Sequence, residues 1–432
     1  MPIVTQETMN ALCAVVQHLP IGTNLALLHF LWMLVNGSLL SSRGAIFPGL
    51  LSISLPPAAI RRAWAAFWSG AWDITDLLEY WREYVEEEGR WQPRTYEGYR
   101  PKAVDITAFW RPTLKNCPSK HYHPQADKAL PAIIMGIIAD VGQVDGHRVA
   151  LPQRFVRINV DDPRESTLRI RLVQDVETHL VPGEIAVFDA GFFIRELQET
   201  RISRYVLRVA KNFTARRNVL PPEKERGRKP EYGEVVRPLA RYYKGKLIPA
   251  TPPGRVETWE IEGRSIRAKI WDHLVRPDLP VNPDNPTFSL FVIYDPLFKS
   301  PWLLITALPL QAASVKSIYT DRWPVEQLPL AAKQMIGAHR QFVSAPESCQ
   351  RLPELALLAG SILTYLAATS PPIPTGFWDR NPQPTPGRFR RALARLPFPE
   401  TYPLPGQIRK KASVTAHLLK GVLGHRRSKQ VA

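Results

Sequence analysis

The segment from residue 319 to residue 333, YTDRWPVEQLPLAAK, carries four chemically distinct side chains at a fixed spacing. Positions i, i+3, i+7 and i+14 are occupied by Tyr319, Arg322, Glu326 and Lys333. At about 100° per residue these positions lie within about 60° of one another around a helix. Such a face joins a carboxylate that can bind a metal ion to cations that neutralise phosphate. An ordinary solvated helix face with one Arg–Glu pair fits the same spacing, so spacing alone does not decide.

The pattern Y-x2-R-x3-E-x6-K formed by these residues resembles the signature of DDE transposases of the insertion-sequence-four family, and every position matches. The resemblance covers about residues 95–370 and is strongest from Trp302 to Gly337. It implies a ribonuclease-H-like fold with a β-rich insertion between the second catalytic Asp and the Glu. Pro324 and Pro329 should kink or restart the helix, because proline lacks a backbone N–H donor.

Composition and charge indicate a folded protein with a polyanionic partner. The chain has 432 residues, enough for two or three domains, and its 45% hydrophobic content excludes a disordered chain. Lysine and arginine number 56 against 39 aspartates and glutamates, which gives a formal net charge of +17. Because counterion release favours binding of nucleic acid to such a protein, nucleic acid is the expected partner. A basic composition can also reflect lineage alone.

The cysteines and the N-terminus indicate a soluble, cytoplasmic protein. Three widely separated cysteines argue against a disulfide framework and for a reducing compartment: Cys13, Cys117 and Cys349. A zinc site at Cys117, His121 and His123 is disfavoured, since no spacing rule is met and no fourth ligand is evident. The N-terminus lacks the pattern of a signal peptide, and the interrupted apolar stretch Leu25–Leu40 is expected to be a buried helix.

Residues 1–92 are expected to form an all-helical N-terminal DNA-binding domain. A helix that runs through Trp68 presents Arg61 and Arg62, as a helix-turn-helix reader requires. A plain helical bundle that packs its aromatic residues explains the same pattern equally well. A further helix, Ile74–Glu88, ends in an acidic run.

Beyond residue 92 the pattern changes to alternating strands and helices, which predicts an α/β fold with a mixed sheet. The expected parts are a ribonuclease-H-like domain in two segments, 93–211 and 287–372, a β-rich insertion at 212–286, and a Pro-rich, basic C-terminal tail at 373–432. In the first segment, strands are predicted at Pro101–Phe109, Ala129–Val141 and Arg148–Ile158, a helix at Arg164–His179, and a buried strand that ends at Asp189.

Three carboxylates are candidates for holding two divalent ions, with Mg²⁺ expected and Mn²⁺ as a substitute. Glu326 belongs to the signature. Asp189 ends a buried strand, where α/β sheets place ligand sites, and it resembles the second acidic position of the family; capping of the helix from Phe193 onward is the alternative. Asp105, on the first strand of the domain, is preferred as the first carboxylate, with Asp140 as its competitor.

The resemblance also implies DNA-contacting residues. Contacts with the phosphates of transposon ends are implied for Tyr319, Arg322 and Lys333. Trp302 could stack against a flipped base, although a core aromatic fits its position as well. Arg208 and Lys211, at a basic strand end, are expected to bind DNA.

The resulting hypothesis is a DNA transposase that cuts double-stranded DNA at transposon ends and joins the freed 3′-hydroxyl to target DNA, in some members of the family through a hairpin. Because two ends must be brought together, a homodimer on DNA is expected. Two alternatives stay open: a domesticated, non-catalytic DNA-binding protein, and another ribonuclease-H-like nuclease.

Overall fold

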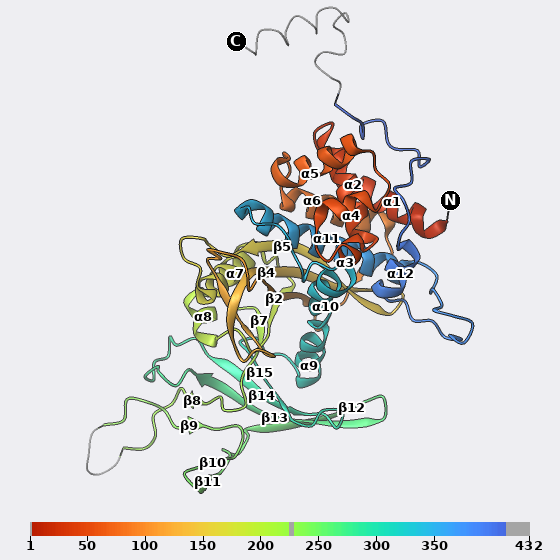
Figure 1. Ribbon diagram of the computed structural model, residues 1–432. Helices are drawn as coiled ribbons and strands as arrows, with labels where there is room; N and C mark the ends of the chain where they lie inside the picture. The colour runs from red at the N-terminus through yellow and green to blue at the C-terminus, as the bar shows by residue number, and fades with distance from the viewer. Residues whose placement is uncertain (1, 224–228, 412–432) are drawn as a thin grey trace, which may run out of the picture.

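The computed structural model describes residues 2–223 and 229–411 and places a large mixed β-sheet among helices (Figure 1). The N-terminal helices gather at one end of the molecule, and the strands between residues 215 and 275 reach the opposite end. The expected α/β class with a mixed sheet is therefore confirmed. Residues 412–432 of the expected basic tail lie outside the described residues.

The N-terminal segment is helical, as predicted. Its helices are α1 (Ile3–Val16), α2 (Thr23–Val35), α3 (Ser38–Ser41), α4 (Ile46–Leu51), α5 (Pro57–Ser69) and α6 (Ile74–Glu88). Pro57 occupies the first turn of α5, where its missing N–H leaves no hydrogen bond unmade. The Asp73 carboxylate caps α6 by accepting the backbone N–H of Thr75 at 2.7 Å. These local signals explain why the boundaries of α5 and α6 could be predicted from the sequence.

The central strands combine an antiparallel meander with two parallel neighbours. The meander consists of β2 (Arg100–Trp110), β4 (Lys128–Val144) and β5 (His147–Arg157), and the parallel strands are β6 (Glu184–Phe188) and β7 (Tyr205–Arg208). Their spatial order is β5-β4-β2-β6-β7. Helices α7 (Glu165–His179) and α8 (Ile194–Glu199) make the crossovers that parallel pairing requires. Two short strands, β1 (Gln92–Pro93) and β3 (Lys120–His123), also pair with β4.

The sheet continues past β7 into the region expected as a β-rich insertion. Strand β7 pairs antiparallel with β15 (Trp302–Thr306), which pairs with β14 (Phe288–Tyr294) and through it with β13 (Arg264–Val275). Strands β8 (Ala215–Arg217), β9 (Val235–Val236) and β12 (Arg255–Ile261) complete this part, while β10 (Arg241–Tyr243) and β11 (Lys246–Ile248) form a separate hairpin. Alternate residues of β13, Ile266, Ala268 and Ile270, are fully buried, which is the pattern of a strand with one covered face.

The remaining helices follow β15. They are α9 (Ala312–Asp321), α10 (Pro324–Leu330), the π-helical turn η1 (Ala331–Ile336), α11 (Pro346–Thr369) and α12 (Pro386–Leu393). Helix α11 is the one described helix that is long and apolar enough to cross a membrane. Yet 83% of its apolar window is buried inside the protein, as in the core helix of a soluble protein.

Two apolar clusters cover opposite faces of the central strands. Ala103 and Phe109 of β2 belong to the cluster that includes the N-terminal helices, α10 and α11. Val104 and Ala108 belong to the cluster that includes α7 and α8. Because side chains alternate along a strand, Asp105 lies on the same face as Ala103 and Phe109. One hydrophobic core therefore joins the N-terminal helices to the sheet, and α11 runs through it.

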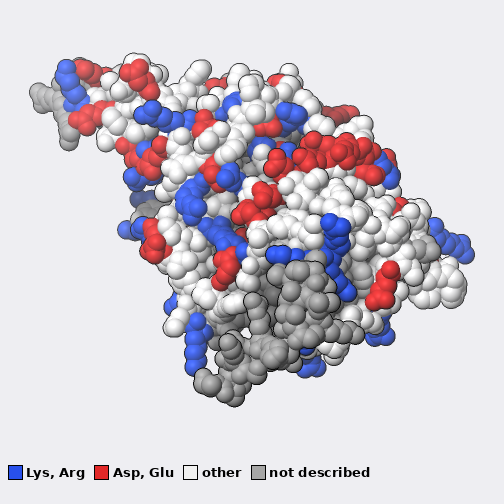
Figure 2. All heavy atoms as spheres, turned by 90° about the horizontal axis from the view of Figure 1, so that it is seen from above, with Lys and Arg blue, Asp and Glu red and all other residues white. Residues whose placement is uncertain are grey.

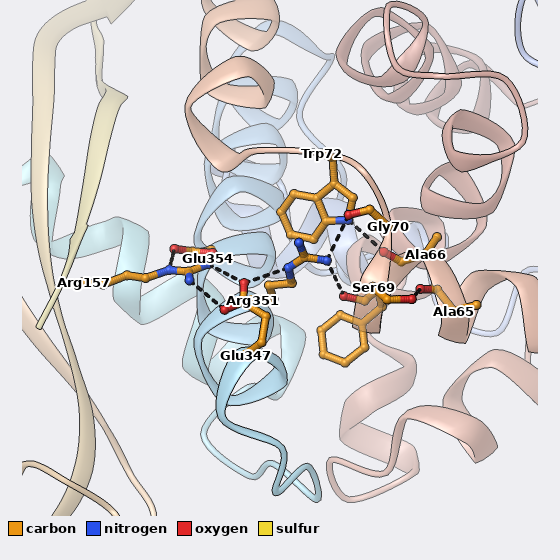
Figure 3. A network of polar contacts seen from close by, with 10 residues as sticks. Ala65, Ala66, Ser69, Gly70, Trp72, Arg157, Glu347, Arg351 and Glu354 are labelled. Carbon is orange, nitrogen blue, oxygen red and sulfur yellow. Dashed lines mark hydrogen bonds and ion pairs between the residues drawn. The ribbon is translucent and has the colours of Figure 1, made fainter. Parts of the chain in front are cut away.

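A polar network ties α11 to its neighbours on both sides (Figure 3). Arg157 of β5 donates to the Glu354 carboxylate at 2.6 and 2.7 Å and to Glu347 at 3.0 Å. Arg351 donates to the same Glu347 at 2.9 Å and to backbone carbonyls at the end of α5 at 3.2 Å, and its guanidinium lies 4.4 Å from the ring centre of Trp72. The network links the sheet, α11 and the N-terminal helices and holds their relative positions.

Candidate active site

The signature segment is not one continuous helix, because its prolines divide it. Helix α9 ends at Asp321, and Pro324 takes the first position of α10. Pro329 lies inside α10, and the chain passes into the π-helical turn η1 directly after it. The restart expected from the prolines is confirmed. The four signature side chains consequently project from α9, from the connection to α10, from α10 and from η1.

Asp105 lies in the middle of β2, with 14% of its side chain exposed. Its Oδ1 is 3.5 Å from Nη1 of Arg322. Burial raises the pKa of Asp105 to about 7, and the charges of Asp189 and Glu326 add to the rise, whereas Arg322 opposes it. Asp105 is therefore a candidate carboxylate on which the charges of both others act.

The parallel pairing of β2 with β6 explains why Asp189 belongs to this group. Ala103 is paired with Val187, and Asp189 directly follows the end of β6, on the strand next to the one that carries Asp105. The Asp189 carboxylate accepts the backbone N–H of Gly191 at 2.9 Å, in a turn that follows the strand. It does not cap α8, because the Glu196 side chain accepts the N–H of Phe193, the residue that precedes the helix, at 3.1 Å.

Glu326 approaches the pair from α10 and binds Arg322, which thus bridges Glu326 and Asp105. The Arg322 side chain is 7% exposed, and its Nε and Nη1 have no hydrogen-bond acceptor. No group of three His, Cys, Asp or Glu within residues 2–223 and 229–411 is close enough to hold a metal ion. In this arrangement Arg322 supplies the positive charge among the acids. The donor set itself, three carboxylates, has the hard oxygen chemistry that Mg²⁺ and Mn²⁺ prefer.

A cationic and aromatic cluster borders the carboxylates. The Tyr319 hydroxyl accepts from Arg208 at 3.3 Å, and its ring stands edge-on to Trp302 with centres 5.4 Å apart. The Arg208 guanidinium lies over both rings, at 5.9 Å from Trp302 and 5.7 Å from Tyr319. Trp302 is half-buried. The signature tyrosine, the strand tryptophan and the β7 arginine are thus brought together.

Lys333 lies on the other side of Asp105. Its Nζ donates to the Thr107 hydroxyl at 2.7 Å and lies 5.2 Å from the ring centre of Trp110. Burial lowers the pKa of Lys333 to about 8, and the charge of Asp105 opposes this effect. A half-buried ammonium group close to a carboxylate cluster is a strong partner for a phosphate, because few waters compete for it.

The other predicted DNA-binding residues are not part of this cluster. Lys211 is exposed in the turn after β7. Arg61 is exposed and Arg62 half-buried on α5, which lies against α2, α4 and α11. The view onto the helical end shows a band of acidic side chains next to basic ones (Figure 2), so this face is not uniformly positive.

Asp140, the competitor for the first carboxylate position, serves a different purpose. It binds Lys102 and Arg82, the latter at 2.7 Å. His121, one of the residues of the zinc alternative, binds Glu165 at 2.8 Å. All three cysteines are free, as expected.

Asp321, inside the signature segment, was not singled out by sequence reasoning. It is fully buried, accepts from the Tyr96 hydroxyl at 2.5 Å, and forms ion pairs with Arg94 at 2.9 Å and Arg148 at 3.2 Å. These contacts hold the end of α9 against the segment between β1 and β2 and against β5. They thereby position Arg322, the next residue. The signal that could have found it is an acid at the last turn of a buried helix, next to a functional arginine.

Comparison with known proteins finds no family model that matches the chain and no curated protein that matches it.

Proposed function

We propose that this protein is a DNA transposase of the DDE type, with a ribonuclease-H-like catalytic domain. The observation that carries the proposal is that Arg322 bridges Asp105 of β2 and Glu326 of α10, while the charge of Asp189 acts on Asp105 and Lys333 donates to the nearby Thr107. The strand order β5-β4-β2-β6-β7, with one antiparallel meander and two parallel strands, supports the proposed domain type. The strands inserted between Asp189 and Glu326 support it further.

Each group has a distinct part in the proposed reaction. Asp105, Asp189 and Glu326 would hold Mg²⁺ or Mn²⁺ once they lie closer together than in the free protein, and the ions would activate a water or 3′-hydroxyl and stabilise the leaving oxygen. The positive charge of Arg322 opposes the rise in the pKa of Asp105 that burial causes, and so favours ionisation of this carboxylate.

The flanking residues position DNA. Lys333 on one side of Asp105 and Arg208 on the other can neutralise successive phosphates, so the strand passes across the carboxylates. Tyr319 orients the Arg208 guanidinium, and its hydroxyl is the group proposed to contact a phosphate of the DNA backbone. Trp302 lies beside Tyr319 and Arg208 and is the candidate to stack against a displaced base. The proposal includes a homodimer on DNA, because two ends must be joined, and a cytoplasmic location.

The test is cleavage of DNA that contains the sequences flanking the gene, with Mg²⁺ or Mn²⁺ present. Asp189→Ala and Glu326→Ala should abolish cleavage, while Asp161→Ala, which removes an exposed acid on another loop, should leave it intact. Loss in all three variants would contradict the assigned roles. Binding without cleavage by the unmutated protein would favour a non-catalytic DNA-binding protein. Cleavage without preference for the flanking ends would favour a general nuclease.

A further inference from the structure

A hollow opens at the end of β2, about 17 Å along the strand from Asp105. It has a volume of about 560 Å³, within the range of about 300–1,000 Å³ for small-ligand sites. Two segments line it, residues 110–115 after β2 and residues 339–344 between η1 and α11. Lys333 connects it to the candidate active site, because its Nζ lies 5.2 Å from the Trp110 ring centre while its carbonyl accepts from His339 at 2.6 Å.

The charge of this hollow is entirely positive. Its lining contains Arg111, Lys115, Arg340 and His339 and no acidic residue. Arg111 is buried and donates to the Gln341 side chain at 3.0 Å and to the backbone of Val343, so its hydrogen bonds are used within the protein. Lys115 and Arg340 are exposed, and neither has an ion pair with a described residue. Two cations are thus available to a ligand.

The exposed aromatic side chain of Phe342 lines the hollow, and hydrogen bonds hold the loop to which it belongs. Phe342 is 71% exposed, although its backbone N–H donates to Gly44 of the N-terminal helical segment at 3.3 Å. The residues on either side of it are the two that Arg111 holds. Because the loop is fixed, a ligand that packs on the Phe342 ring orders few additional groups on binding. Exposure of a large ring on a fixed loop is a feature of a binding platform.

An exposed aromatic ring, free cations and no acids together suit a nucleic acid with an unpaired base, which stacks on the ring while its phosphate meets a cation. A paired base does not fit, because its faces are already covered by its neighbours. Along β2, Trp110 lies five residues from Asp105, or about 17 Å at 3.3–3.4 Å per residue. That distance corresponds to about five stacked nucleotides at 3.4 Å each.

We propose that this hollow binds unpaired nucleotides of the DNA strand that continues past the cleaved phosphate, with Phe342 as the stacking platform and Arg340 and Lys115 as the phosphate contacts. The proposal rests on the proposed function, since it assigns a second part of the same DNA path. It predicts that the protein prefers duplex DNA with a single-stranded extension over blunt duplex DNA.

The experiment compares two fluorescent probes in an anisotropy titration: a blunt duplex and the same duplex with an unpaired tail of about six thymidines. The unmutated protein should bind the tailed probe more tightly. Phe342→Ala should reduce affinity for the tailed probe by about 5- to 150-fold, the usual loss for one stacking ring, and leave blunt duplex binding unchanged. Phe342→Tyr should retain the preference.

The matched control is Phe377→Ala, which removes a phenylalanine that is 96% exposed and outside the hollow. Equal losses in Phe342→Ala and Phe377→Ala, or no preference of the unmutated protein for the tailed probe, would overturn the inference. If cleavage at the flanking ends is observed while the tail adds nothing, the inference fails and the transposase proposal stands. If neither probe is bound and no cleavage occurs, both fail.

Discussion

Asp105 provides the sharpest quantitative test of the site, through the dependence of protein stability on pH. Its pKa is raised from an ordinary value of 3.8 to about 7, with burial as the largest cause. Between these values the folded protein retains a proton that the unfolded chain releases. Stability must therefore fall as pH rises from about 4 to about 7, because the folded state binds more protons than the unfolded state. Above about pH 7 the buried carboxylate is ionised and its full destabilising effect is present.

The magnitude follows from the size of the pKa change. One pKa unit corresponds to about 1.4 kcal/mol, so Asp105 should lower the free energy of unfolding by about 2.5 kcal/mol between pH 5 and pH 8. Asp105→Asn carries no titrating proton but keeps the shape of the side chain and an oxygen for Arg322. The variant should lose this part of the pH dependence. The result does not depend on how the substitution affects stability at any single pH.

Urea denaturation in metal-free buffer at pH 5 and pH 8 measures the effect. The quantity to compare is the change in unfolding free energy between the two pH values, for the unmutated protein and for Asp105→Asn. Asp161→Asn, in which an exposed aspartate is replaced, should behave like the unmutated protein. Equal pH dependence in the unmutated protein and Asp105→Asn would show that Asp105 is ionised near its ordinary pKa, and would refute its burial beside other acids.

Three further predictions concern other parts of the molecule. Lys333→Met should weaken DNA binding and lower the slope of log affinity against log salt by about one; an unchanged slope would exclude a phosphate contact. Glu354→Gln should reduce the free energy of unfolding by about 1.5–3 kcal/mol, because its hydrogen bonds with Arg157 lose the carboxylate charge while Arg157 keeps Glu347 as a partner. Glu347→Gln, at a side chain 47% exposed, should cost less than about 1 kcal/mol in the same urea assay, and equal losses would contradict the role of burial. Asp140→Asn should lower the melting temperature but preserve metal-dependent cleavage by the folded protein, and lost cleavage would reopen the choice of first carboxylate.

Much of the local structure could be predicted because local signals determine it. Helix α6 begins at the residue after its Asp73 cap, and Pro324 starts α10, since capping and proline chemistry act over a few residues. Asp105 was preferred over Asp140 from its place on the first strand, and the ion pairs of Asp140 with Lys102 and Arg82 agree with that choice.

Partners far apart in the sequence could not be predicted. Asp321 meets Arg94 and Arg148 across about 170 to 230 residues, and only the strand topology brings them together. The bridging position of Arg322 between Asp105 and Glu326 has the same origin. Spacing within the signature indicated an Arg–Glu pair, but the contact with β2 depends on how the broken helix lies against the sheet.

The position of α11 in the chain has a consequence for protein synthesis. Helices α1 to α5 pack against α11 or share its core, yet α11 begins only at Pro346, about 280 residues after α5 ends at Ser69. At about 5–20 residues per second, a ribosome needs roughly 14–55 s to cover that interval. During this time the apolar faces of the first helices lack their cover. The nascent chain is therefore a natural client for chaperones that shield hydrophobic surface until translation reaches α11.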